Sequence, residues 1–231
     1  MRSVNAVFGK QTRILLKNKE MLIQFLLFPA VAIIFNLMIG YQPGMAENMF
    51  VKMMASVFAG MGLITVSAGI IAEDRERKSL RLLIMAGVKP QSYLVGISAA
   101  IMLGAIFSSL AFGFAASFSG ADFFRFLAIM LLGALASTLL GATIGILAKN
   151  QQAATSLSMP VAVVLGFGPM ISAFNETVGR VLYPFYTQQI NVVIENVSES
   201  ILRPALISLA NIVVLTILFV LAYRKKGLGN T

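Results

Sequence analysis

Six long stretches without a single charged residue constrain the fold of this chain more than any other feature. They cover residues 21–46, 53–72, 90–121, 126–148, 150–175 and 204–223. A hydrocarbon core about 30 Å thick is crossed by roughly 20 residues of helix, so each stretch is long enough to span it. Only 12% of the residues are charged, whereas soluble domains have about a quarter. The sequence therefore predicts an all-α integral membrane protein with six transmembrane helices.

The helix bounds follow from the apolar stretches. The predicted spans are about 21–41, 52–72, 93–117, 124–147, 153–174 and 203–223, in a single transmembrane domain over residues 1–231. The third stretch exceeds one crossing but is too short for two, so its end should leave the membrane as a loop. Pro160 and Pro169 predict a kink or break in the fifth span. Residues 175–202 are too polar for a seventh span and should form an external segment.

The basic residues predict the orientation. An even number of spans places both termini on one side, and the side richer in Lys and Arg is cytoplasmic. Fourteen basic residues fall on the side of the termini: Arg2, Lys10, Arg13, Lys17, Lys19, Arg75, Arg77, Lys78, Arg81, Lys89, Lys149, Arg224, Lys225 and Lys226. Four fall on the other side: Lys52, Arg125, Arg180 and Arg203. Both termini are therefore predicted to be cytoplasmic, and we expect a multi-pass protein of a bacterial plasma membrane.

Residues 2–19 repeat apolar side chains at helical spacing, with basic residues opposite. The apolar positions are Val4, Val7, Phe8, Ile14 and Leu15. This pattern favours an interfacial amphipathic helix whose cations bind anionic lipid headgroups while its apolar stripe sinks to the acyl boundary. The alternative is a plain cytoplasmic leader.

The third and fourth spans each have a small residue at every fourth position. These ridges are Gly96, Ala100, Gly104 and Ser108, then Gly133, Ser137, Gly141 and Gly145. Small residues let helices approach closely in lipid, so we expect these two spans to pack together. A pore lined by small residues is the alternative.

Several kinds of chemistry are excluded by composition. The chain has no histidine and no cysteine, which removes histidine-based hydrolysis, cysteine nucleophiles and the usual metal ligands. The six stretches contain no ionisable residue, which disfavours proton-driven transport. There is no phosphate-binding G-x-x-x-x-G-K-[ST] loop. We therefore expect no catalytic residue, metal site or cofactor in this chain, and its basic surplus follows membrane topology rather than nucleic-acid binding.

The loop between the second and third spans is the most informative segment. It reads E-D-R-E-R-K-S-L-R-L-L-I-M-A-G-V-K-P from Glu73 to Pro90. Its charges recur at four-residue spacing beside a leucine-rich stripe, which predicts a short amphipathic helix over 73–88. A helix this short needs a surface to rest on. An ordinary positively charged connection is the alternative, although such a loop has no need of acidic residues.

This loop resembles the coupling helix of type-2 ABC exporter permeases. The six spans, the amphipathic entry helix and a proline-broken fifth span with an external re-entrant segment extend the resemblance over nearly the whole chain. Many members have glycine where Lys78 stands and Thr-Pro where Ala86 and Gly87 stand.

The resemblance implies a permease that pairs with a second copy or a homologue and docks on separate ATP-binding subunits, which would hold the ATP and magnesium. The coupling residues would be Glu73, Arg75, Glu76, Arg77, Ser79, Leu80, Leu83 and Gly87. The second and fifth spans would face the substrate pathway, with Thr65, Ser67, Ser158 and Ser172 as mild polar groups. That lining suits an amphiphilic drug, peptide or lipid-like cargo. Two other functions stay open: a substrate-capture subunit of a vitamin importer, and a regulatory or immunity membrane protein that transports nothing.

Overall fold

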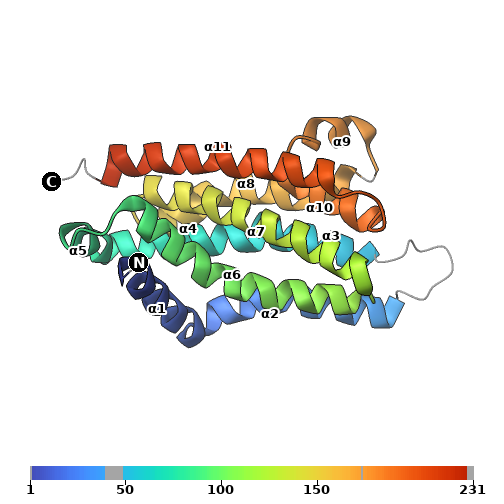
Figure 1. Cartoon of the computed structure of the whole chain (residues 1–231), viewed down its shortest axis with the longest axis horizontal. Coiled ribbons are helices and arrows are strands. Elements are labelled where there is room, and N and C mark those ends of the chain that lie inside the picture. The colour runs from blue at the N-terminus through green and yellow to red at the C-terminus, as the bar shows by residue number, and fades with distance from the viewer. Residues whose placement is uncertain (1, 40–48, 173, 228–231) are drawn as a thin grey trace.

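The computed structural model describes residues 2–39, 49–172 and 174–227, and every element within these residues is helical (Figure 1). The elements are α1 (Arg2–Lys17), α2 (Lys19–Ile39), α3 (Met49–Val57), η1 (Phe58–Gly62), α4 (Leu63–Glu76), α5 (Ser79–Met85), α6 (Pro90–Ala115), α7 (Gly120–Leu147), α8 (Gln151–Ser172), α9 (Glu176–Leu182), α10 (Tyr186–Glu195) and α11 (Leu202–Gly227). The predicted all-α fold is confirmed.

Six stretches of the described residues are long and apolar enough to cross a membrane. They are Met21–Met38, Met49–Glu76, Gln91–Ala115, Gly120–Leu147, Gln151–Ser172 and Leu202–Lys225. The prediction of six spans preceded by an N-terminal helix is confirmed. The predicted first span extends over residues 40 and 41, and the fifth over residue 173, which lie outside the described residues.

The long helices run side by side, and the short ones gather at the two ends of the bundle. The start of α1, the end of α11 and α5 lie together at one end, whereas α9 and α10 lie at the other (Figure 1). The charge distribution predicts that the first of these ends is cytoplasmic.

The N-terminal helix packs against protein along the stripe that was expected to enter lipid. Val7, Gln11 and Leu15 are buried at four-residue spacing, and α1 runs along α6. Gly96 of α6 makes this approach possible, because a Cβ there would lie 2.7 Å from the Val7 side chain. The expectation that Val7 and Leu15 sink to the acyl boundary is therefore wrong, since α6 covers that face first.

The second span contains a π-helical turn where it crosses the fifth span. The turn is η1, between α3 and α4. A Cβ on Gly60 would lie 2.5 Å from the backbone carbon of Leu165 and 2.6 Å from Gly166 Cα in α8. The two backbones therefore touch at Gly60, and glycine is required there because any side chain would occupy the space of the other main chain.

The fifth span is a continuous helix with Pro160 and Pro169 inside it. The predicted break is therefore absent. Near the end of this helix the Pro169 carbonyl accepts hydrogen bonds from Ser172 Oγ (2.6 Å) and from Asn191 Nδ2 of α10 (2.9 Å), which connects α8 to α10.

The two ridges of small residues lie in helix contacts, but with different partners from those expected. On α6, Gly104 faces the Phe25 ring of α2, and Ser108 Oγ donates to the Phe25 carbonyl at 2.6 Å. On α7, Gly141 and Gly145 face α4. All eight residues of the two ridges are buried: Gly96, Ala100, Gly104 and Ser108 on α6, and Gly133, Ser137, Gly141 and Gly145 on α7. The two spans do contact each other. The glycines of each ridge, however, lie against other helices.

Candidate functional site

The segment between the second and third spans forms a turn and a short helix at the end of the bundle that holds both chain ends. Glu73 to Glu76 form the last turn of α4, and α5 begins only at Ser79. Lys78 between them has a positive φ of 58°, and Gly87 after α5 has a φ of 77°. The Val88 N–H donates to the Leu83 carbonyl at 3.0 Å, which closes α5 with a Schellman-type end. The prediction of one helix over 73–88 is therefore wrong, because the chain turns at Lys78.

Two of the charged residues in this segment bond within the subunit. Arg75 Nη1 donates to the carbonyls of Ile146 and Ala148 at the end of α7, both at 2.6 Å. Glu76 Oε2 accepts from the Gln151 N–H at the start of α8, at 3.0 Å. A cation at a helix C-terminus and an anion at a helix N-terminus both complement the helix dipole. Arg75 and Glu76 thus fasten α4 to α7 and α8.

Other side chains of this segment face outward. Arg77 is 76% exposed and pairs with Glu73 four residues earlier at 2.9 Å. Leu82 and Met85 are 65% and 75% exposed. Leucine and methionine so exposed on a seven-residue helix are candidates for a contact with another molecule. Neither is among the coupling residues predicted from the sequence, which include Leu80 and Leu83.

The other side of α5 rests on the bundle. Leu83 and Val88 pack against the main hydrophobic cluster. The side chain of Leu80 lies outside the described residues. Leu83 therefore anchors α5, and the exposed face passes through Leu82 and Met85.

Asp74 is a further residue that the sequence did not single out. Its carboxylate is buried and accepts hydrogen bonds from Lys10 Nζ, Gln11 Nε2, the Ser79 hydroxyl and the Tyr93 hydroxyl at 2.5 to 3.1 Å. The available signal was its helical spacing from Ser67 and Ile71, which are both fully buried. Asp74 continues that buried face.

The amino-acid sequence of the chain matches one family of membrane proteins. The model of the ABC-2 family transporter proteins matches residues 16–222. The chain belongs to the ABC-2 transporter family. Among curated proteins, no match was found. The resemblance to type-2 ABC permeases is thereby confirmed.

The turn at Lys78 uses left-handed backbone. Such backbone costs a residue with a Cβ roughly 1 kcal/mol, whereas glycine adopts it freely. The position therefore favours glycine on physical grounds. This ABC-2 chain keeps the turn with lysine, whose side chain is exposed.

The hydroxyls of the four polar residues proposed for the pathway bond to the main chain of their own helices. The hydroxyls of Thr65, Ser67 and Ser158 bond to main-chain carbonyls of their own helices. Ser172 Oγ also lies 3.0 Å from Gln188 Oε1 of α10. Their hydrogen bonds are satisfied locally, so any cargo would meet mainly the apolar side chains around them.

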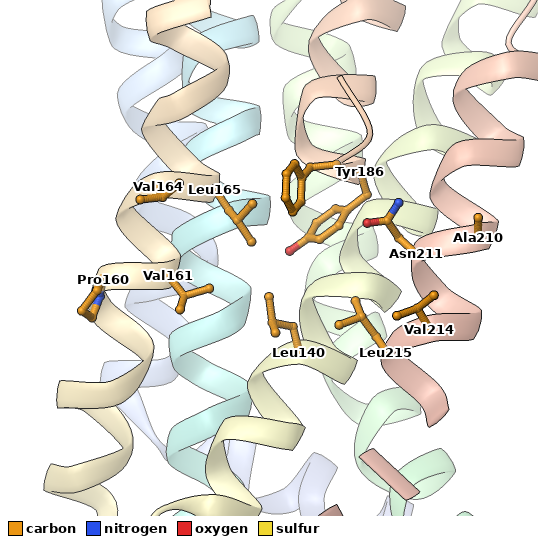
Figure 2. A pocket seen from close by; sticks show the side chains of 11 residues that line it. Leu140, Pro160, Val161, Val164, Leu165, Tyr186, Ala210, Asn211, Val214 and Leu215 are labelled. Atoms are coloured by element: carbon orange, nitrogen blue, oxygen red, sulfur yellow. The ribbon is translucent and has the colours of Figure 1, made fainter. Parts of the chain in front are cut away.

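A groove of about 640 Å³ lies instead between α8 and α11, with α7 and α10 at its base. Figure 2 shows Leu165, Val161 and Leu215 around it, with the Asn211 amide and Tyr186 as its polar members. Asn211 Nδ2 donates to the Pro184 carbonyl at 2.8 Å. Its size and apolar walls are those of a site for an apolar or amphiphilic molecule.

Within the part of the chain that the structure describes, no three acidic side chains gather in a way that could hold a metal ion. The assignment of ATP and magnesium to a partner subunit stays a prediction.

Proposed function

We propose that this chain is the membrane subunit of an ATP-driven exporter and that α5 docks on a separate ATP-binding subunit. One observation carries the proposal: α5 is anchored to the bundle through Leu83 while Leu82 and Met85 stand exposed. Turns at Lys78 and Gly87 separate this helix from the neighbouring spans. A contact there would push on α4 and α6 directly, because α5 is joined to both by turns of two to four residues.

The proposal includes a second permease copy and a pathway along the second and fifth spans. The touching backbones at Gly60 and Gly166 make these spans neighbours. An amphiphilic cargo is supported by the apolar groove beside α8 and by spans without ionisable residues. ATP hydrolysis belongs to the partner, and this chain supplies no catalytic group.

Purification in mild detergent tests the docking. Leu82→Asp and Met85→Asp are expected to lower the amount of co-purified ATP-binding subunit at least about tenfold, because a desolvated charge opposing an apolar contact costs more than 1.4 kcal/mol. Quantitative mass spectrometry of the eluate measures the ratio of the subunits. ATP hydrolysis in the eluate should fall in proportion.

Val181→Asp is the matched control. Val181 is also 65% exposed but lies on α9 at the opposite end of the bundle. It should leave the subunit ratio unchanged. If both α5 variants retained the ATP-binding subunit, the proposed docking through α5 would be refuted. If no such subunit co-purified with the unsubstituted chain, the exporter proposal would be refuted, and a regulatory or immunity protein would be favoured.

A further inference from the structure

The carboxylate of Asp74, near the end of α4, receives hydrogen bonds from three other helices. Lys10 and Gln11 reach it from α1, Ser79 from the start of α5 and Tyr93 from α6. Asp74 is 5% exposed. A buried carboxylate is tolerated only when its oxygens are paired, and four donors including one cation satisfy it here.

The two oxygens divide these partners. Oδ1 receives Lys10 Nζ at 2.5 Å and the Ser79 hydroxyl at 2.8 Å. Oδ2 receives Gln11 Nε2 at 2.7 Å and the Tyr93 hydroxyl at 3.1 Å. Lys10 also lies 3.4 Å from Ser79 Oγ. Each oxygen therefore connects α1 to another helix by hydrogen bonds, and removal of the carboxylate would remove both of these connections.

The remaining contacts of α1 differ in kind. Its apolar stripe lies on α6 through Val7 and Gly96, and apolar surfaces permit sliding more readily than directional bonds do. Within the described residues, the hydrogen bonds that join α1 to α4 and α5 all end on Asp74 or Ser79. Asp74 is thus the point at which displacement of α5 would be passed to α1.

We propose that Asp74 is a positioning residue for coupling, which makes α1 and the start of α6 move with α5 when an ATP-binding subunit pushes on α5. This inference rests on the proposed function, since a docked subunit supplies the push. It adds a second route for that push: besides the turn that joins α5 directly to α6, the displacement passes through α1 to the region of Gly96.

Spin-label distances can test this inference directly, because the chain has no cysteine of its own. Labels on Ala6→Cys in α1 and Ala86→Cys after α5 report the separation of the two segments. In the purified chain with Asp74 unchanged, the distribution of distances between the two labels should be narrow. Asp74→Asn and Lys10→Met should broaden it by about twofold, as expected when a helix loses its directional bonds and opens locally. Asp122→Asn, which breaks an ion pair with Arg125 at the other end, should leave it narrow.

The same labels in the complex with its co-purified ATP-binding subunit test the coupling. Addition of ATP with vanadate should leave the α1 to α5 distance unchanged when Asp74 is present, because the segments move together. The distance should shift in Asp74→Asn while the subunit stays bound. A thermal unfolding midpoint that stays close to the unsubstituted value shows that this variant is folded, and Lys10→Met provides a second test through a partly exposed residue.

A distribution in Asp74→Asn and Lys10→Met as narrow as that of the parent, with or without ATP, would overturn the inference. Failure of the proposed function gives a different result. In that case no ATP-binding subunit co-purifies and the coupling role falls, while the measurement on the chain alone still decides whether Asp74 fastens α1 to α5.

Discussion

Replacing Gly60 with alanine is expected to destabilise this ABC-2 transporter by about 3 kcal/mol, at the upper end of the cost of overpacking. The added Cβ would meet main-chain atoms of Leu165 and Gly166. No side chain there can rotate away, so the second and fifth spans would have to separate. Thermal unfolding in detergent should show a midpoint lowered by roughly 6–12 °C, and Gly60→Leu should give no folded protein.

Two other glycines provide the comparison. Gly69 lies nine residues further along the same span, where a Cβ would approach only Gln151 Nε2 at 4.0 Å. Gly69→Ala should be neutral or stabilise by up to about 1 kcal/mol, since alanine favours helix. Gly166→Ala faces Met61 at 3.3 Å and should cost less than Gly60→Ala. Equal midpoints for Gly60→Ala and Gly69→Ala would contradict the close crossing.

Arg75→Gln is expected to lower the free energy of unfolding by about 3 kcal/mol, the sum of two modest charge-assisted hydrogen bonds. The substitution withdraws the donor from the Ile146 and Ala148 carbonyls and the cation from the end of α7. Urea or thermal unfolding of the purified chain measures this loss without any partner.

Arg77→Gln is the matched substitution two residues away. Arg77 is largely exposed and pairs only with Glu73 among the described residues. Surface pairs of this kind contribute about 0.5 kcal/mol or less, so the unfolding curve should barely move. If Arg77→Gln destabilised the chain as much as Arg75→Gln, the assignment of Arg75 to the interior contacts would be wrong.

The spans were predictable from the sequence because they depend on the local absence of charge. The predicted span 124–147 and helix α7 (Gly120–Leu147) end at the same residue and differ by four residues at the start. The predicted break in the fifth span was wrong, because proline is a local signal for a break, whereas the packing of α8 against α3, η1 and α4 involves residues distant in the sequence. The π-helical turn at Phe58–Gly62 had no signal beyond two glycines.

The coupling segment could be located from the sequence, but the direction of its side chains could not. Arg75 and Arg77 are the same residue type two positions apart, and they differ only in the direction of their side chains. Arg75 points to the end of α7, which is distant in the sequence. For the same reason Asp74 was not distinguished within its run of charges, and the coupling residues were predicted to include Leu83 but not Leu82. Lys78 gave no local sign of the turn, because lysine does not favour the left-handed backbone found there.

The central claim is that α5 is a cytoplasmic docking helix, and labelling a cysteine at position 85 tests it most directly. Met85→Cys in the otherwise cysteine-free chain should react with a membrane-impermeant maleimide only in inverted vesicles, and co-expression of the ATP-binding subunit should protect it. Val181→Cys should react in intact cells. Labelling of Met85→Cys from outside intact cells would contradict the account.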